Sequence, residues 1–295
     1  MKYTDIADTE CAIAQALAVV GDWWTLLVVR DVAGGLRRFD DLQKELGVSR
    51  KVLAGRLASL VEHGVLEKRR YQQHPPRYEY HLSRSGEGLM PVLIALQDWA
   101  TRYVIGDGSL TATAPGGSPE IERVRHLVGM RIAEISLVDH AGELRDPISG
   151  SGWTVLYCYP GAYAEGNAYP VGWGDIPGTK GCTLESVTFR NRLSEFAGRD
   201  AQVVGVSTQR PEEQAAFAAK EDIPFPLVSD QDLLLAAALR LPTFRAAGSD
   251  RLKRVTLVVD RDRTVRGVLY PIADAARSVG DALDLLDWAS SAAPR

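Results

Sequence analysis

One cysteine of this chain stands where its thiol could act as a nucleophile. Cys182 follows the Gly- and Pro-bearing loop 176–181 and opens an amphipathic segment that predicts a helix. In a first helical turn, unpaired backbone N–H groups and the positive end of the helix dipole favour a thiolate over a thiol. Thr179, three residues upstream, can direct its hydroxyl toward the same point. The alternative is a buried, inert cysteine.

A helix-turn-helix pattern provides a second candidate site. Residues 39–46 form a short amphipathic segment closed by Gly47, and Ser49 then fits the N-cap of a helix through Val61. Apolar side chains at helical spacing give this second helix a buried face. They are Leu53, Leu57 and Leu60.

The opposite face of that helix is flat and flanked by cations. Small residues let a backbone approach closely, and cations at the edges suit phosphates, so the face fits a DNA major groove. The alternative is an ordinary solvated helix face. The face carries Lys51, Gly55, Ala58 and Ser59, with Arg50 at the N-terminal end and Arg56 on the flank.

A basic hairpin is expected after this helix. Residues 65–71 and 78–82 alternate in polarity and flank a connection that contains Pro75 and Pro76. Between Arg50 and Arg84 the chain has eight basic and three acidic side chains. A wing of this kind would reach the neighbouring backbone or minor groove of DNA. Its arginines are Arg69, Arg70 and Arg77.

Other elements must position these residues. Residues 11–29 are apolar but broken at Gly21-Asp22, which predicts two helices, and residues 89–104 carry an apolar stripe that is either core or a dimer seam. Farther on, strands are expected over residues 153–159, 201–207, 254–260 and 264–270, with helices over residues 182–196, 211–220, 232–240 and 273–288. This order predicts a mixed sheet with helices on both faces, the thioredoxin-like arrangement.

Two domains are therefore expected. A mainly α winged helix-turn-helix domain should occupy residues 1–105, and an α/β thioredoxin-like domain should occupy residues 128–295. Residues 106–127 should link them, because residues 106–119 are rich in Gly, Pro, Ser and Thr and lack periodicity. Residues 120–127 form a short helix in this scheme.

Composition narrows the possible functions. The chain has 295 residues, of which 45% are hydrophobic, so disorder is excluded, and its net charge of −4 excludes a basic protein that coats nucleic acid. It shows no membrane-length apolar run and no signal-peptide pattern, so we expect a cytoplasmic protein that does not enter a membrane. Cys11, Cys158 and Cys182 fit neither a disulfide scaffold nor a zinc site, and we expect no metal and no cofactor.

The N-terminal part resembles the HxlR-type winged helix-turn-helix regulators over residues 10–104. The resemblance implies a homodimer, formed by the segments around residues 11–20 and 89–104, that reads a short palindromic operator in double-stranded DNA. It places Ser49, Arg50, Lys51, Arg56 and the wing arginines against DNA. The matching residues are Cys11, Gly21-Asp22-Trp23-Trp24-Thr25-Leu26-Leu27, Arg37-Arg38-Phe39, Leu53-x-x-Arg56-Leu57-x-x-Leu60, Gly64 and Pro75-Pro76-Arg77-Tyr78-Glu79-Tyr80.

Cys11 occupies a position of interest within that resemblance. The family often has a cysteine just before its first helix, and in some members this cysteine senses electrophiles or oxidants. The alternative for Cys11 is a small buried hydrophobe.

The C-terminal part resembles the peroxiredoxins (the AhpC/TSA group), nearest their Q-type or bacterioferritin-comigratory branch. The resemblance implies that Cys182 attacks the O–O bond of a peroxide and becomes a sulfenic acid, that Thr179 hydrogen-bonds the peroxide and that Arg254 stabilises the charge. The alternative for Arg254 is a surface salt bridge. The matching residues are Tyr157-Cys158-Tyr159-Pro160, Thr179-x-x-Cys182-Thr183-x-Glu185, Phe189-Arg190, Val203-Val204-Gly205-Val206-Ser207, Pro224-Phe225-Pro226-Leu227-Val228-Ser229-Asp230 and Arg254-Val255-Thr256-Leu257-Val258-Val259-Asp260.

The chain departs from the peroxiredoxin pattern around this loop. Asp175 stands where the family has a proline four residues before the threonine, and Pro177 stands two before it instead. An insertion, residues 161–178, lengthens the approach to the site. It is expected to form a lid or an interface.

The Q-type branch commonly has a resolving cysteine four or five residues after the reactive one. Here those positions are Ser186 and Val187. A sulfenic acid at Cys182 would then need an external thiol, Cys158, or Cys11 of the same or the partner chain. Cys158 lies on an expected strand and is better explained as core.

These observations lead to three hypotheses. In the first, the protein is a redox-responsive transcription regulator whose fused peroxiredoxin-like domain senses or reduces peroxide through Cys182. In the second, it is a one-cysteine thiol-dependent peroxidase that carries a DNA-binding module. In the third, the second domain is a degenerate scaffold in which Cys182 is inert.

Overall fold

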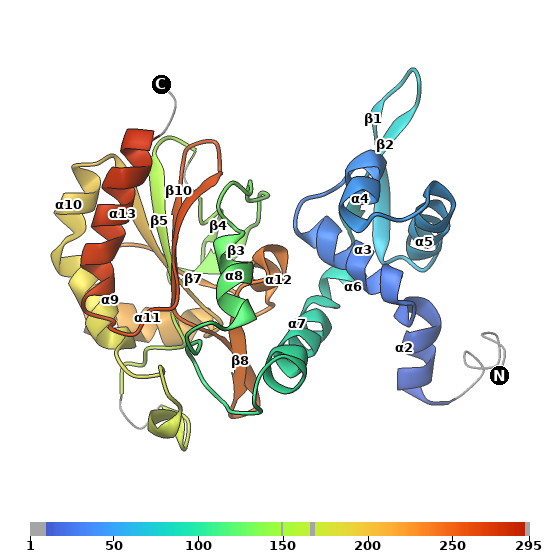
Figure 1. Cartoon of the computed structure of the whole chain (residues 1–295). Coiled ribbons are helices and arrows are strands. Elements are labelled where there is room, and N and C mark those ends of the chain that lie inside the picture. The colour runs from blue at the N-terminus through green and yellow to red at the C-terminus, as the bar shows by residue number, and fades with distance from the viewer. Residues whose placement is uncertain (1–9, 149, 166–168, 293–295) are drawn as a thin grey trace. The chain divides into compact units, whose positions relative to one another are not determined.

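The chain folds into two compact units. The structure is a computed structural model that describes residues 10–148, 150–165 and 169–292 (Figure 1). The first unit is Met1–Leu93 and the second is Ile94–Arg295.

The first unit holds the helix-turn-helix. Its elements are α2 (Ala12–Val20), α3 (Trp23–Ala33), α4 (Phe39–Leu46), α5 (Arg50–Glu62), β1 (Leu66–Gln72), β2 (Arg77–Leu82) and α6 (Arg84–Glu87). The predicted break at Gly21-Asp22 is confirmed, because the Asp22 side chain accepts a hydrogen bond from Trp24 N at 3.0 Å and caps α3. Gly47 ends α4 with a left-handed φ of 65°.

The second helix of the motif is anchored by the predicted stripe. Leu53, Leu57 and Leu60 are each 1% exposed, and α5 packs against α3, α4 and β1. Strands β1 and β2 pair antiparallel with Leu66 opposite Leu82, which confirms the expected hairpin. One apolar side of α5 is thus buried while its other side remains on the surface.

Helix α7 (Met90–Trp99) crosses the division between the units and continues as a π-helical turn, Ala100–Val104. Four side chains of the predicted apolar stripe are exposed rather than core. These are Val92 at 46%, Leu96 at 48%, Trp99 at 57% and Tyr103 at 56%.

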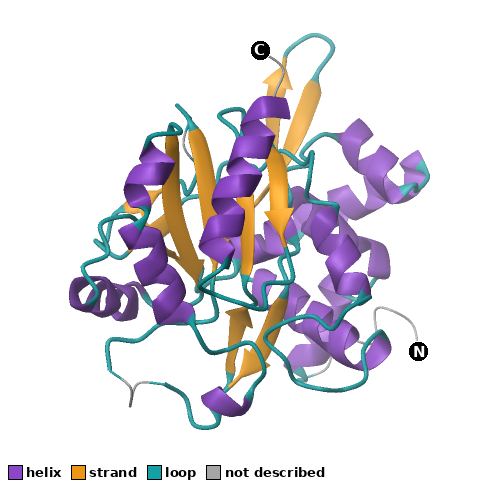
Figure 2. Ribbon diagram, turned by 60° about the vertical axis from the view of Figure 1, so that its left-hand side comes forward, coloured by secondary structure: helices purple, strands orange, loops and turns teal. Residues whose placement is uncertain are grey.

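The second unit is built on a mixed β-sheet (Figures 1 and 2). The sheet has seven strands in the order β11-β10-β5-β6-β7-β3-β4. Strands β5, β6 and β7 are parallel, and β10 runs antiparallel to β5 and β11. The thioredoxin-like arrangement is confirmed. The strands are β3 (Leu137–Asp139), β4 (Leu144–Arg145), β5 (Trp153–Cys158), β6 (Ala201–Ser207), β7 (Leu227–Ser229), β10 (Val255–Val259) and β11 (Val265–Leu269).

Helices and a separate hairpin complete this unit. The predicted helix over residues 182–196 is divided into α9 and α10, and the hairpin β8–β9 was not predicted. The helices are α8 (Pro119–Arg125), α9 (Cys182–Asn191), α10 (Leu193–Ala197), α11 (Pro211–Lys220), α12 (Leu234–Leu239) and α13 (Ser278–Ala292), and the hairpin strands are β8 (Thr243–Ala246) and β9 (Ser249–Leu252).

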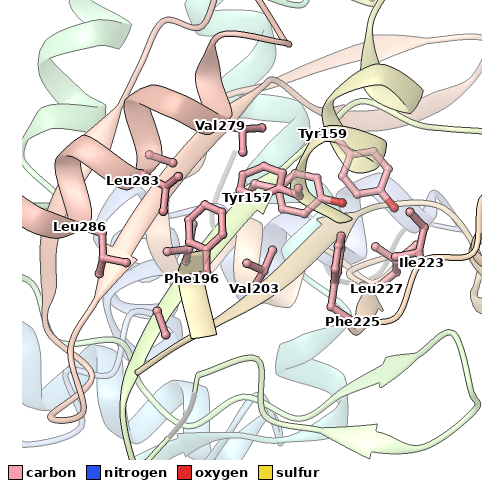
Figure 3. Packing of buried hydrophobic residues seen from close by; sticks show 14 of the residues in the cluster. Tyr157, Tyr159, Phe196, Val203, Ile223, Phe225, Leu227, Val279, Leu283 and Leu286 are labelled. Atoms are coloured by element: carbon pink, nitrogen blue, oxygen red, sulfur yellow. The ribbon is translucent and has the colours of Figure 1, made fainter. Parts of the chain in front are cut away.

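An aromatic core lies on the sheet face covered by α9, α10, α11 and α13 (Figure 3). Tyr157 of β5 stacks on Phe189 of α9 with ring centroids 4.4 Å apart and on Tyr159 at 5.5 Å. Val155, Tyr157 and Tyr159 belong to this core, whereas the alternate residues of β5 point to the other face. The core therefore fixes the start of α9 relative to the sheet.

Residues 106–127, expected as a flexible or partly extended linker that ends in a short helix, pack within the second unit. Ala112 is buried, and its N–H donates to the carbonyl of Pro177 at 2.8 Å. Glu120, the second residue of α8, is 1% exposed and accepts from Lys253 Nζ at 3.0 Å. The buried ion pair holds this segment in the second unit, an attachment that local composition does not encode.

Among the described residues, no single helix is long and apolar enough to cross a membrane. Helices α2 and α3 meet the length and composition criterion only as a pair, with a bend of 74° between them.

Candidate functional site

Cys182 is the first residue of α9, as the sequence predicted. The helix is entered through Gly181, whose φ is 101° and whose missing side chain matters, since a Cβ there would lie 2.8 Å from Ala275 Cβ. Glycine tolerates this backbone conformation where other residues are strained. The thiol is only 2% exposed.

Arg254 holds the sulfur of Cys182. It immediately precedes β10, is 3% exposed, and donates from Nη2 to Cys182 Sγ at 3.2 Å. Its Nε donates to Glu185 Oε2 at 2.8 Å and its Nη1 to the Gly178 carbonyl at 3.1 Å. The surface salt bridge considered for Arg254 is therefore wrong, because its partners are a buried carboxylate, the loop backbone and the thiol.

Two further residues orient that arginine. Glu185 is fully buried one turn after Cys182, and its Oε1 accepts from Ser278 Oγ of α13 at 3.0 Å. The position of Glu185 could be read from the sequence, because residues three apart share a helix face. Ser278 is far along the chain, and no sequence signal indicated it.

Thr179 lies beside the thiol through its backbone rather than its hydroxyl. The Cys182 thiol donates to the Thr179 carbonyl with a sulfur–oxygen distance of 3.5 Å. The Thr179 hydroxyl lies 2.6 Å from the carbonyl oxygen of Trp173 and 2.8 Å from that of Ile176. In this state the hydroxyl stabilises the loop and is not directed at the sulfur.

The insertion at residues 161–178 supports the same loop. Its described part includes a short 3-10 turn, Trp173–Asp175, and Trp173 packs in a second apolar cluster with Ala112 and Phe244. Residues 166–168 lie outside the described residues. Through the carbonyl of Trp173, this cluster reaches Thr179.

Burial works against the thiolate in this arrangement. Burial raises the pKa of Cys182 above its ordinary value, while the Arg254 guanidinium and the Gly161 backbone N–H lower it and the Glu185 carboxylate raises it. The sequence predicted a pKa lowered by the helix N-terminus. That direction is wrong for this closed state, because desolvation outweighs the stabilising groups.

The other two thiols occupy different environments. Cys158 is fully buried on β5, and alternation along the strand turns it away from the face that holds Tyr157 and Cys182. Burial raises the pKa of the Cys158 thiol far above its ordinary value.

Cys11 is exposed at the N-cap of α2, so the interpretation of a buried hydrophobe is wrong. All three thiols are free.

The helix-turn-helix residues lie on the surface of the first unit. Ser49 caps α5 by accepting from Val52 N at 3.3 Å. Arg50 pairs with Asp40 at 3.0 Å, and its guanidinium lies 4.7 Å from the ring centroid of Phe39. Lys51 is exposed. These contacts leave basic groups at the outer N-terminal end of α5.

The remaining basic candidates are held near the same helix or on the hairpin. Arg56 pairs with Asp22 at 2.9 Å, and Arg69 pairs with Glu67 at 2.8 Å. Arg70 donates to the carbonyls of Gln72 and Gln73 in the hairpin turn. Arg77 is exposed. These ion pairs are accessible to solvent and therefore weak. The arginines can leave their carboxylate partners to bind other anions.

Both units match known families. The family model described as HxlR-like helix-turn-helix matches residues 19–107, and the AhpC/TSA family model matches residues 176–268. An uncharacterized HTH-type transcriptional regulator of Mycobacterium tuberculosis is 33% identical over 132 residues, which are 45% of this chain and 78% of that protein.

The second unit has relatives of its own. A protein of M. tuberculosis named "Putative peroxiredoxin" is 32% identical over 143 residues, which are 48% of this chain and 83% of that protein. The crystal structure of peroxidoxin BcpB from M. tuberculosis has 31% sequence identity and a TM-score of 0.46, and the match covers 55% of this chain and 96% of that chain.

Fold and site thus define a two-part protein, in which a winged helix-turn-helix unit is followed by a thioredoxin-like unit with a thiol held by an arginine. The chain belongs to the HxlR-like helix-turn-helix family through its N-terminal part and to the AhpC/TSA (peroxiredoxin) family through its C-terminal part.

Proposed function

We propose that this protein is a redox-responsive, DNA-binding transcription regulator that detects peroxide through Cys182. The observation that carries the proposal is the 3.2 Å contact between Arg254 Nη2 and Cys182 Sγ, in the same chain as an exposed basic helix. Covalent connection makes the encounter of the two parts intramolecular.

The chemistry at Cys182 is an oxygen transfer. The thiolate attacks the distal oxygen of a hydroperoxide, an S–O bond forms as the O–O bond breaks, and the leaving oxygen takes a proton to become water or an alcohol. Sulfur is oxidised to a sulfenic acid, and the peroxide is reduced. Arg254 is placed to stabilise the thiolate and the charge that moves onto the oxygens.

The thiol must become accessible before it reacts. Because Cys182 is 2% exposed and Thr179 turns its hydroxyl to the loop, loop 176–181 has to shift to admit a peroxide. That shift would free the Thr179 hydroxyl to hydrogen-bond the peroxide. It would also restore water to the sulfur and weaken the desolvation that raises the pKa of Cys182.

DNA is assigned to the first unit. Helix α5 offers a flat face with Ser49, Arg50, Lys51 and Arg56 at its edges, as entry into a major groove requires. The hairpin arginines Arg69, Arg70 and Arg77 are exposed and suited to phosphates. The expected partner is a double-stranded operator.

A homodimer fits the exposed apolar side chains of α2 and α7. Ile13 is 72% exposed and Leu17 is 50% exposed on α2, and Val92 is 46% exposed on α7. Large apolar side chains that are exposed on a helix favour an interaction site. These are the segments to which the HxlR-type resemblance assigned the dimer.

The test is an operator titration at stated salt concentration with the reduced and the peroxide-treated full chain. We expect peroxide to change the operator Kd of the wild type and of Cys11→Ser, but not that of Cys182→Ser. An equal response of Cys182→Ser, or no response of the wild type, would contradict the proposal.

A one-cysteine peroxidase remains the second candidate. It is favoured by the position of Cys158, which points to the other face of the sheet and cannot form a disulfide with Cys182 without rearrangement. An external thiol would then restore the cysteine. Many cycles of peroxide consumption per chain with such a thiol, without any change in operator affinity, would favour this function.

A further inference from the structure

A cavity of about 660 Å³ lies within the second unit, apart from the thiol. Its walls come from the end of α7 and the π-helical turn, from the segment that leads to α8, and from the hairpin β8–β9. The volume falls in the range of pockets that hold small organic molecules. No residue of its lining is a candidate for the peroxide chemistry.

One side of the cavity is aromatic. Trp99, Tyr103 and Phe244 line it, together with Ile105 and Leu110. Tyr103 lies in the π-helical turn, an interruption of α-helix that often accompanies functional sites. Aromatic walls of this kind suit a flat apolar body and also attract cations through their ring faces.

The cations around the cavity are already engaged. Lys253 Nζ donates to both oxygens of Glu120 and to the Thr113 carbonyl. Arg245 donates to Asp250 Oδ2 and to the Gly248 carbonyl, and Arg102 Nε donates to the Gly108 carbonyl. An anionic ligand would have to displace these contacts.

Two carboxylates of the cavity wall, in contrast, can accept further hydrogen bonds. Among the residues that the structure describes, the buried oxygens Asp98 Oδ2 and Asp250 Oδ1 have no hydrogen-bond partner. The other oxygen of Asp98 accepts from the Thr243 hydroxyl. Buried acceptors are normally paired, so each unpaired oxygen calls for a donor.

The charges around Asp98 favour a cation beside it. Burial raises the pKa of Asp98 to about 6, with Asp250 and Glu120 also raising it and the Thr243 hydroxyl and Lys253 lowering it. A cation placed beside Asp98 would offset both the desolvation and the repulsion.

We propose that this cavity binds a small organic amine with an aryl-bearing body, whose ammonium group donates to Asp98 and Asp250 while the ring packs against Trp99, Tyr103 and Phe244. The ligand is a cation because two carboxylates of the wall keep an unpaired oxygen while the basic groups of the wall are already engaged. Since both unpaired oxygens are buried, Asp98 and Asp250 have to turn toward the cavity to accept from the ammonium. This site is separate from the thiol site, and a ligand can bind there without oxidation of the protein.

Occupation of the cavity would act on two functional segments. Asp98 and Trp99 belong to α7, which begins in the first unit. Thr111 also lines the cavity, and the next residue, Ala112, donates to Pro177 in the loop before Cys182 at 2.8 Å. An amine bound here would therefore contact segments connected to the DNA-binding unit and to the thiol loop.

The test uses three probes that differ only at one end: 4-phenylbutylamine, 4-phenylbutanol and 4-phenylbutyrate. Each is titrated calorimetrically into the reduced full chain at pH 7.5. We expect the amine to bind at least about tenfold more tightly than the alcohol and the acid. Equal affinities, or no binding of the amine at millimolar concentration, would overturn the proposal.

Variants locate the binding. Asp98→Asn should lose the preference for the amine while keeping the affinity for the alcohol, and Asp107→Asn, which removes an exposed charge at the rim, should bind like the wild type. An unchanged amine affinity in Asp98→Asn would refute the assignment. If circular dichroism shows that this variant does not fold, Asp250→Asn provides the same comparison and the same two outcomes.

Discussion

At the scale of the residue, the thiol of Cys182 is subject to opposing influences. Burial raises its pKa, whereas the guanidinium of Arg254 at 3.2 Å and the N–H of Gly161 lower it. The structure therefore buries the thiol and keeps beside it the groups that lower its pKa. Arg254 in turn depends on Glu185, whose carboxylate holds it at 2.8 Å.

Arg254→Lys tests this balance. A lysine keeps the charge but cannot bridge Cys182 and Glu185 as a guanidinium does. With less stabilisation of the thiolate, the pKa of Cys182 should rise further, so the midpoint for alkylation of Cys182 should move to higher pH. We also expect the rate constant with hydrogen peroxide to fall roughly hundredfold.

Arg192→Lys is the matched control, because Arg192 lies just after α9 and pairs at the surface with Glu195. It should leave both the alkylation midpoint and the peroxide rate constant unchanged. An alkylation midpoint that is the same in Arg254→Lys and the wild type would show that the guanidinium does not stabilise the thiolate.

At the scale of the element, residues 106–127 show how tertiary contacts override composition. A Gly-, Pro- and Ser-rich segment is typical of linkers, yet this one is fixed by Ala112 against the thiol loop and by Glu120 against Lys253. The Glu120 carboxylate also accepts from the hydroxyl of Tyr270. A buried ion pair of this kind is costly to break on one side only.

Glu120→Gln should therefore destabilise the second unit. The amide removes the carboxylate that pairs with the Lys253 ammonium, whose side chain is only 6% exposed. We expect the free energy of unfolding in urea to fall by about 3 kcal/mol. Glu122→Gln on the same helix, which affects only the exposed pair with Arg125, should change it by less than about 0.5 kcal/mol. Equal effects would mean that the segment is not held by this pair.

Much of the fold could be predicted because periodicity is local. The break at Gly21-Asp22, the helix with Leu53, Leu57 and Leu60, and strand β6 each carry their own apolar pattern. Strand β7 has only three residues, too few for a periodic signal, and the hairpin β8–β9 has four in each strand. Such short strands are set by their sheet partners.

The candidate site was predictable to a similar extent. The start of α9 at Cys182 followed from the Gly-bearing loop, and the family resemblance indicated Arg254. The burial of the thiol and the contact of Ser278 with Glu185 depend on segments far apart in the sequence. The engagement of the Thr179 hydroxyl by the insertion likewise depends on how the loop folds back.

At the scale of the whole molecule, oxidation of Cys182 can alter DNA binding only under two conditions. The protein must have conformations that differ in DNA affinity, and oxidation must stabilise one of them more than the other. The chain supplies a physical connection, because α7 begins in the first unit and ends in the second. Dimerisation through α2 and α7 would place that helix at the interface.

Leu17→Glu tests the assembly. Leu17 is 50% exposed on α2, and a carboxylate there would be buried without a partner in the dimer. We expect sedimentation to show the wild type as a dimer and Leu17→Glu as a monomer at micromolar concentration. Leu144→Glu, at a 75% exposed position of β4, should remain a dimer. A dimeric Leu17→Glu would exclude α2 from the interface.

Mass mapping of the full chain after stoichiometric hydrogen peroxide tests most directly whether Cys182 detects peroxide. We expect one added oxygen at Cys182, formed faster than any modification of the exposed Cys11 and trapped by a sulfenic-acid reagent. Oxidation of Cys11 first, or a Cys182 that reacts no faster than a free thiol in solution, would contradict it.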